Sequence, residues 1–148
     1  MEQIVIKQIR ETSAEFPQVW QLREEILRKP LGLSLKNEDL SDDKQDDIFI
    51  AIEGDKVIGC VMMHPLDNKV IKLRQMAVDE DKQGKGIGKL LVQAAENFAW
   101  ENDYDKIKLH ARQHAQGFYT GMGYSTIGDI FIEVSIPHVA MEKSKPLQ

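Results

Sequence analysis

Apolar and polar residues alternate along several short stretches of the chain, which is the pattern of half-buried β-strands. Two continuous apolar runs flank Glu53-Gly54-Asp55, which is typical of a hairpin turn, and Pro65 to Asn68 marks a second turn. Strands are therefore predicted over residues 4–9, 48–52, 57–63, 70–78 and 106–111, with a closing pair of strands within residues 124–141.

Three other segments carry apolar residues at steps of three and four, which predicts amphipathic helices. The first runs from a capping box at Thr12 and Glu15 to about Arg28, where Pro30 ends it. The second covers residues 86–102 and the third residues 113–122. The resulting order, β-α-β-β-β-α-β-α-β-β, mixes hairpins with crossovers and so predicts a mixed α/β sheet with helices on its faces.

The strand at residues 70–78 changes its apolar phase between Leu73 and Met76. A slip of one residue in a pattern of period two is what a β-bulge produces, so a bulge is expected here. Cys60 lies in the apolar run Val57 to Met63, and it is interpreted as a packed core thiol rather than a nucleophile.

Composition narrows the classes of function. The chain has 148 residues, 42% hydrophobic and 29% charged, which suits one domain over residues 1–148. Its net charge of −5 argues against nucleic acid as the main partner. It has one cysteine, no apolar run of membrane-spanning length and a start unlike a signal peptide. A cytoplasmic location, no membrane partner and no metal site are expected.

The segment from Lys36 to Asp47 is strongly acidic. One interpretation is a solvated loop, and the other is a flap over a cationic substrate such as a polyamine, an aminosugar or a lysine. Its acidic residues are Glu38, Asp39, Asp42, Asp43, Asp46 and Asp47.

The most informative stretch joins the strand ending at Val78 to the helix that follows. Glycines alternate in Gln83-Gly84-Lys85-Gly86-Ile87-Gly88, so successive N–H groups are exposed next to a helix N-terminus. Such a loop suits a diphosphate, and Lys82, Lys85 and Lys89 would add positive charge. A P-loop is excluded because Leu90 follows Gly88-Lys89 where a hydroxyl is needed. A Rossmann fingerprint requires a different glycine spacing.

The loop matches the pyrophosphate-binding pattern Gln/Arg-x-x-Gly-x-Gly/Ala of the GNAT superfamily of N-acetyltransferases, which the chain resembles along nearly its whole length. Ala115 to Tyr124 is similar to a second signature, A-x-x-F-Y-x-x-x-G-F/Y. The resemblance implies the GNAT fold, which has a mostly antiparallel sheet of six to seven strands, a splayed fourth and fifth strand and about four flanking helices. It also implies acetyl-CoA as cosubstrate, an amine acceptor and, as is common among relatives, a homodimer.

The resemblance also assigns residues to the cosubstrate. The fourth strand would offer backbone groups to the pantetheine arm, and the loop would wrap the diphosphate. His114 stands where many relatives have an asparagine that touches the pantetheine. The implied binding residues are Met76, Ala77, Val78, Gln83, Gly84, Lys85, Gly86, Ile87, Gly88, Lys89, His114 and Tyr119.

Tyr119 matches a tyrosine near the coenzyme sulfur, where a phenol can donate a proton to the leaving thiolate; the alternative is a core tyrosine. The tail Phe131 to Met141 resembles a subgroup (the ElaA-like and YjcF-like proteins) ending in F-x-E-x-G-I-P-H-x-x-M, with Ser135 replacing the glycine. Glu133 and His138 are candidate general bases or a structural pair. In an extended segment, Glu133 and Ser135 would share one face.

Three further residues have open roles. His110 ends a strand beside the presumed cleft, and a structural role is favoured for it. Arg23 and Arg28 would line the acceptor site or pair with the acidic segment. The chain is thus expected to be an acetyl-CoA-dependent N-acetyltransferase acting on a primary amine of a small molecule or protein. The alternative is a non-catalytic acyl-CoA-binding or sensing module on the same fold.

Overall fold

The computed structural model describes residues 3–147, so residues 1, 2 and 148 of the predicted domain lie outside the described part. Seven strands form one sheet in the order β1-β2-β3-β4-β5-β7-β6, and all neighbours are antiparallel except β4 and β5. The strands are β1 (Ile4–Ile9), β2 (Asp47–Glu53), β3 (Lys56–Pro65), β4 (Val70–Val78), β5 (Lys106–Arg112), β6 (Ser125–Glu133) and β7 (Ile136–Ser144). The predicted order of strands and helices is confirmed.

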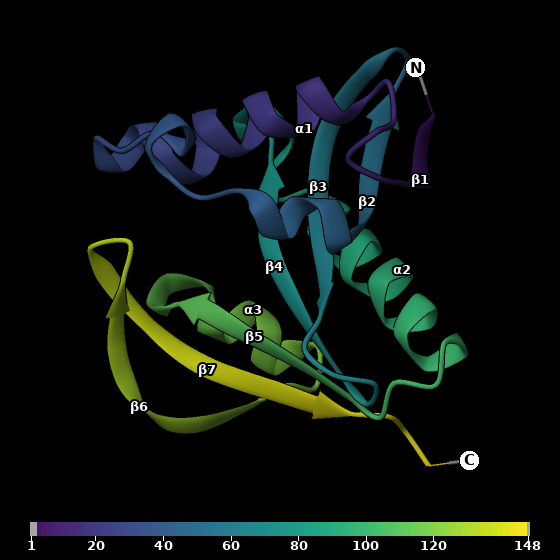
Figure 1. Ribbon diagram of the computed structural model, residues 1–148, viewed down its shortest axis with the longest axis vertical. Coiled ribbons are helices and arrows are strands. Elements are labelled where there is room, and N and C mark those ends of the chain that lie inside the picture. The colour runs from purple at the N-terminus through teal and green to yellow at the C-terminus, as the bar shows by residue number, and fades with distance from the viewer. Residues whose placement is uncertain (1–2, 148) are drawn as a thin grey trace.

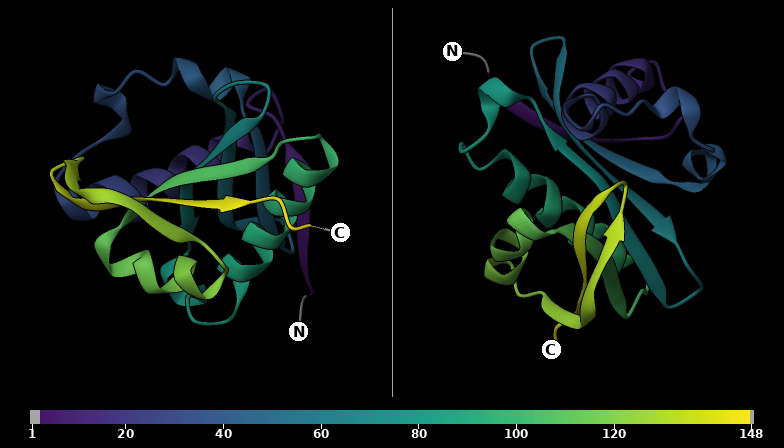
Figure 2. Two further views of the ribbon diagram at one scale, coloured as in Figure 1. Left: turned by 90° about the horizontal axis from the view of Figure 1, so that it is seen from below. Right: turned by 90° about the vertical axis from the view of Figure 1, so that its left-hand side faces the viewer.

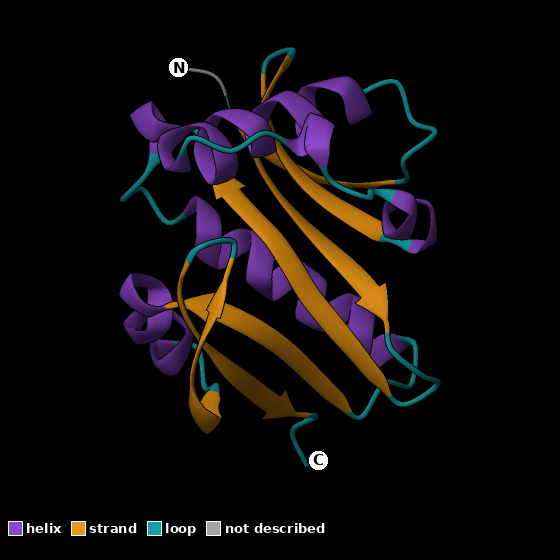
Figure 3. Ribbon diagram, turned by 60° about the vertical axis from the view of Figure 1, so that its left-hand side comes forward, coloured by secondary structure: helices purple, strands orange, loops and turns teal. Residues whose placement is uncertain are grey.

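Helices cover both faces of the sheet (Figures 1 and 3). Helix α2 (Ile87–Glu101) buries an i, i+4 row that includes Leu91, Ala95 and Ala99 against one face. Helix α1 (Phe16–Arg23) and the π-helical turn η1 (Glu24–Arg28) pack on the other face. Because β3 is covered on both sides, seven successive residues of it are buried rather than alternating. Helix α3 (Gln116–Gly121) follows the short 3₁₀ turn η6 (Gln113–Ala115).

The predicted capping box before α1 is wrong. The helix begins at Phe16 with Glu15 as N-cap, and no side chain caps it. The Glu15 carboxylate instead pairs with Lys7 on β1. Pro17 in the first turn lacks an N–H group, so one fewer donor there needs a partner.

The predicted bulge lies in β4. The register passes from Met62↔Arg74 to Cys60↔Ala77, so two residues of β4 oppose one of β3. Gln75 has a φ of 56°, which is a left-handed conformation at the bulge. Its carbonyl oxygen lies 3.4 Å from the Sγ of Cys60, which is fully buried as predicted.

The β4–β5 pair is the feature that creates a site. Its parallel register extends only from Val70↔Lys106 to Leu73↔Leu109. Beyond Leu73 the two strands diverge, β4 toward α1 and β5 toward the β6–β7 hairpin (Figure 1). In both views of Figure 2 that yellow hairpin borders β5 at one edge of the sheet. Within residues 3–147, no helix is both long and apolar enough to cross a membrane.

Candidate active site

A cleft of about 1000 Å³ occupies the wedge between the diverging ends of β4 and β5. Its walls come from segments far apart in the sequence: η1, the ends of β4 and β5, the loop before α2, α3 and the β6–β7 turn. We call its two sides the loop half and the hairpin half. The loop half is formed by residues 76–78, 83, 84, 86–89, 114 and 119. The hairpin half is formed by Leu27, Arg28, Glu38, Lys72, His110, Arg112, Glu133, Val134 and His138.

The loop half contains nearly all of the residues predicted to bind the cosubstrate. Lys85 is the exception, since it does not line the cleft. The residues that do are Met76, Ala77, Val78, Gln83, Gly84, Gly86, Ile87, Gly88, Lys89, His114 and Tyr119.

The backbone of the loop is open toward the cleft. Gly84 and Gly86 have φ values of 78° and 84°, which residues with a Cβ adopt only at a cost. In the described chain, no backbone N–H from Gly84 to Lys89 donates to a protein acceptor. The Gln83 Nε2 donates to the Val78 carbonyl oxygen at 2.9 Å and closes the turn. This row of free donors at the start of α2 is suited to binding an anion.

The three lysines near the loop differ. Lys82 lines the cleft, but its Nζ lies 2.7 Å from Glu53 Oε1, so its charge is balanced within the protein. The contact with Glu53 is the main cause of a raised pKa of Lys82, and nearby carboxylates add a smaller effect in the same direction. Lys85 and Lys89 have no ion-pair partner within residues 3–147. The charge available to an anion therefore comes from these two.

Tyr119 closes the loop half from α3. Its side chain is buried, and its hydroxyl has no hydrogen-bond partner in the described chain, although it is not sealed from the cleft. Burial raises the pKa of Tyr119, which keeps the phenol protonated. Phe118 packs edge-on against its ring and also lines the cleft. Sequence reasoning treated Phe118 only as part of the signature.

In the hairpin half, Glu133 and His138 come together in a way that sequence reasoning did not expect. The segment is not extended, because Val134 and Ser135 turn the chain with φ values of 44° and 69°. Glu133 pairs across the hairpin with Ile136, and Phe131 pairs with His138. Since cross-strand pairs and i, i+2 neighbours share a face, Glu133 and His138 face the same side. Ser135, not sharing that face, forms the turn.

The tautomer of His138 follows from its contacts. Its Nδ1 lies 2.9 Å from the Ile136 carbonyl oxygen, which can only accept, so Nδ1 carries the proton. In the neutral ring the lone pair is therefore on Nε2, which lies 3.8 Å from Glu133 Oε2. The other Glu133 oxygen lies 3.2 Å from His110 Nδ1, so His110 belongs to the cluster despite the structural role predicted for it. The Lys72 Nζ lies 3.4 Å from that same His110 nitrogen.

Two arginines close the hairpin half. Arg28 makes a bidentate contact with Glu38, with Nε and Nη2 donating at 2.6 and 3.1 Å. Its Nη1 and the Nη2 of Arg112 both donate to the Leu27 carbonyl oxygen, at 3.1 and 2.6 Å. Sequence reasoning missed Arg112. The signal was available, because Arg112 is two residues after His110 at the end of a strand and therefore faces the same side.

Two carboxylates of the acidic segment are not solvated. Asp43 and Asp46 are buried. Asp43 accepts from Arg23 at 2.8 Å and from Arg74 at 2.6 Å. Asp46 accepts from Arg74 at 2.8 Å and contacts His64 at 2.7 Å. These two carboxylates neutralise cationic side chains inside the protein. They are therefore neither solvated nor part of a flap over the substrate. Arg23 and Arg28 pair with the segment, and Arg28 also lines the cleft.

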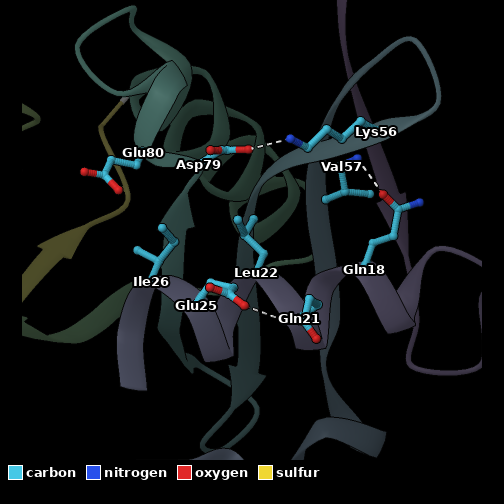
Figure 4. Close-up of a pocket in the computed structure, with 9 residues that line it drawn as sticks. All are labelled: Gln18, Gln21, Leu22, Glu25, Ile26, Lys56, Val57, Asp79 and Glu80. Carbon is cyan, nitrogen blue, oxygen red and sulfur yellow. Dashed lines mark hydrogen bonds and ion pairs between the residues drawn. The ribbon is translucent and has the colours of Figure 1, made fainter. Parts of the chain in front are cut away.

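A second, smaller cavity of about 340 Å³ lies between α1 and the start of β3 (Figure 4). Its polar side chains are largely paired: Lys56 with Asp79 at 2.9 Å and Gln21 with Glu25 at 2.7 Å. Gln18 accepts from the Val57 N–H at 2.9 Å. It contains none of the predicted site residues, so the wedge remains the candidate active site.

Comparison with known proteins agrees with this geometry. A family model described as the acetyltransferase (GNAT) domain matches residues 24–145. A candidate acetyltransferase of Bacillus subtilis is 36% identical over 72 residues, which are 49% of each chain. Human N-acetyltransferase 8B is 30% identical over 94 residues, 58% of this chain and 41% of that protein. The chain thus spans about half the length of the first curated relatives that it matches.

Solved structures show the same fold. Escherichia coli ElaA superposes with a TM-score of 0.84 at 19% identity, over 96% of this chain and 100% of that one. A GNAT family acetyltransferase from Elizabethkingia anophelis with acetyl-CoA bound gives 0.72 at 16% identity, over 96% and 98%. Since the family model matches well over half of its residues, the chain belongs to the GNAT acetyltransferase family.

Proposed function

We propose that this chain is an acetyl-CoA-dependent N-acetyltransferase that acts on a primary amine by direct attack in a ternary complex. The observation that carries the proposal is one cleft with free loop N–H groups, an unpartnered Tyr119 hydroxyl and a His138 nitrogen with a lone pair. The N-acetyltransferase named among the relatives and the acetyl-CoA bound to the Elizabethkingia protein support it. The ElaA-like fold and the tail from Phe131 to Met141 favour the ElaA-like subgroup.

The loop half fits the cosubstrate. The N–H groups from Gly84 to Lys89 would bind the diphosphate, with Lys85 and Lys89 adding charge. Met76 and Val78 lie beyond Leu73, where β4 no longer pairs with β5. Backbone groups on that open edge of β4, apart from the Val78 carbonyl oxygen that accepts from Gln83, are therefore available to an amide-rich arm. His114 would contact the same arm. Acetyl-CoA supplies the acetyl group as a reactive thioester.

The hairpin half would prepare the amine. An amine must lose a proton before it attacks, and the His138 Nε2 is placed to accept that proton. Glu133 would orient the protonated amine and then stabilise the charged imidazole, since its Oε2 is 3.8 Å from Nε2. As the N–C bond forms and the C–S bond breaks, Tyr119 would donate its proton to the departing sulfur, and the second proton of the attacking nitrogen would return to the phenolate. The phenol is suited to this role because burial keeps it protonated.

The test is acceptor-dependent release of free CoA across amines, aminosugars, polyamines and peptides, with wild type and Tyr119→Phe. Turnover in Tyr119→Phe should fall by about 100-fold with acetyl-CoA affinity nearly unchanged. Tyr124→Phe is the matched control. The Tyr124 hydroxyl donates to Glu96 at 2.8 Å in the core, so its loss should cost about 1 kcal/mol of stability and leave turnover intact.

Three outcomes separate the alternatives. Equal activity in Tyr119→Phe would remove Tyr119 from the chemistry while leaving the enzyme class intact. Binding of acetyl-CoA without release for any acceptor would favour a sensing module. Absence of acetyl-CoA binding would overturn the proposal.

A further inference from the structure

The hairpin half holds the guanidinium groups of Arg28 and Arg112, and only one of the two pairs with a carboxylate. Glu38 is occupied by the bidentate contact from Arg28. Arg112 makes one hydrogen bond, to the Leu27 carbonyl oxygen, and no carboxylate within residues 3–147 pairs with it. Both arginines line the cleft. This part of the cleft therefore carries an unbalanced positive charge.

The charge on Arg112 persists because a guanidinium is not deprotonated in proteins. Its side chain is only partly exposed. Burial is the main cause of a lowered pKa of Arg112, and the charge of Arg28 adds a smaller effect in the same direction. A partly buried cation without a counter-ion is costly unless something in solution pairs with it. Its remaining N–H donors form a planar fork, which matches the two oxygens of a carboxylate.

Arg112 also lies beside the groups proposed to handle the amine. Arg112 and His138 are directly paired across β5 and β7, so their Cα atoms are about 5 Å apart and their side chains share a face. His110, on the same face of β5, contacts Glu133. A molecule that reaches both Arg112 and His138 has its anionic group and its amine close together.

We infer that the acceptor is a small primary amine with a carboxylate a few bonds from its nitrogen, and that Arg112, supported by Arg28, binds this carboxylate. The inference rests on the proposed acetyltransferase function and names the substrate class of the same site. Arg112 would fix the acid end while Glu133 and His138 receive the amine end. A polyamine or other purely cationic acceptor would instead bring its charge against Arg112.

The acidic segment no longer supports the expectation of a cationic acceptor. Asp43 and Asp46 form ion pairs with Arg23, Arg74 and His64, so they are not available to an acceptor. Glu38, the one acid of the segment that lines the cleft, is held by Arg28. Arg112 could instead bind a phosphate of the cosubstrate. In that case Arg112 variants would lose affinity for acetyl-CoA, which the experiment below measures.

The experiment compares each of a panel of α- and β-amino acids with its own carboxamide. The amide retains the shape and the amine but lacks the negative charge, and its less basic amine favours attack at neutral pH. A preference for the acid thus cannot come from the nucleophile. We expect CoA release with the best acid to exceed that with its amide by at least about tenfold in kcat/KM.

Arg112→Gln should raise the KM for the acid by about 10- to 100-fold, leave the KM for the amide unchanged, and leave acetyl-CoA affinity unchanged. Arg112→Lys retains the charge without the fork and should give an intermediate KM. The fold should tolerate both changes, because Arg28 Nη1 still donates to the Leu27 carbonyl oxygen. Arg10→Gln, which removes an equal charge from an exposed side chain outside the cleft, is the matched control.

A binding measurement keeps the two proposals separate. Calorimetry with N-acetyl amino acids and their N-acetyl amides, in the presence of CoA, tests the carboxylate site without turnover. Acid binding that depends on Arg112, with no CoA release for any acceptor, would overturn the proposed function and support the carboxylate site. Amides and amines that match or exceed the acids in both rate and binding would overturn the inference alone. Loss of acetyl-CoA affinity in Arg112→Gln would also overturn it.

Discussion

The two halves of the cleft present different kinds of chemistry. The loop half offers main-chain N–H groups from one contiguous stretch, Gly84 to Lys89. The hairpin half offers side chains from η1, β5, the acidic segment and the β6–β7 turn. A backbone cradle depends on conformation and suits a ligand part that is the same in every reaction. A side-chain site depends on residue identity, so it is where one member of a family can differ from another.

The halves also differ in how they reach unusual backbone conformations. Both left-handed positions in the loop are glycines, Gly84 and Gly86. The hairpin turn places Val134 and Ser135 at positive φ, and a β-branched residue there is strained. The loop therefore holds its shape at little cost, whereas the hairpin tip stores strain at the edge of the cleft.

The largest loss of turnover is expected for a substitution in the hairpin half. In His138→Asn, the new amide can donate to the Ile136 carbonyl oxygen in place of Nδ1, but no basic nitrogen remains. Turnover at pH 7 should fall by about 100-fold or more, with acetyl-CoA affinity unchanged. Steady-state kinetics and calorimetry on the same preparation check both parts.

His64→Asn is the control for His138→Asn. His64 pairs with Asp46 outside the cleft, so its loss should affect stability rather than rate. Undiminished turnover in His138→Asn would show that His138 is not the base. Glu133→Gln would then become the variant that decides whether the hairpin half holds a base at all.

A smaller effect, on affinity, is expected in the loop half. Gly86→Val forces a β-branched residue to a φ of 84°, which costs about 1–2 kcal/mol and tilts the N–H groups. Acetyl-CoA affinity should fall by about tenfold. Gly32→Val carries the same strain at a φ of 72° outside the cleft, and it should lower stability without changing affinity. Equal affinities in the two variants would contradict the role of the loop.

The smallest effect concerns the strained turn. Ser135→Gly relieves a left-handed serine at a φ of 69°, and after the entropy of glycine is subtracted it should stabilise the protein by up to about 1 kcal/mol. Chemical denaturation measures this. Ser125→Gly, in the extended strand β6, should instead destabilise by about 0.5–1 kcal/mol. If both variants are destabilised, the turn is not strained at Ser135.

Sequence patterns predicted the conformation of the loop well because it follows from local rules. Alternating glycines before an amphipathic helix specify both conformation and free donors within a few residues. The bulge at Gln75 was visible as a shift in period two. The order of strands and helices followed from equally local signals, since most elements bury one face of their own and β3, which is buried on both faces, is a continuous apolar run between two turns.

The hairpin half was less predictable because its contacts join distant segments. The pairing of Arg112 with Leu27 spans 85 positions. The same difficulty applies outside the cleft, where Arg23 of α1 pairs with Asp43 in a segment that composition alone describes as solvated. Charge density cannot tell a carboxylate in water from one that meets a buried arginine. The turn at Val134 and Ser135 was missed because neither residue is a usual choice for positive φ.

The placement of Cys60 has a practical consequence for how the reaction is followed. It is the only cysteine of the chain, and it lies fully buried beneath the β4 bulge. Burial raises the pKa of its thiol to about 12, against a smaller opposing effect of the Arg23 charge. The folded protein therefore presents no reactive thiolate to a chromogenic disulfide at neutral pH. The colour in such an assay would therefore report free CoA rather than the enzyme, and a slow rise without acceptor would report hydrolysis of acetyl-CoA or unfolded protein.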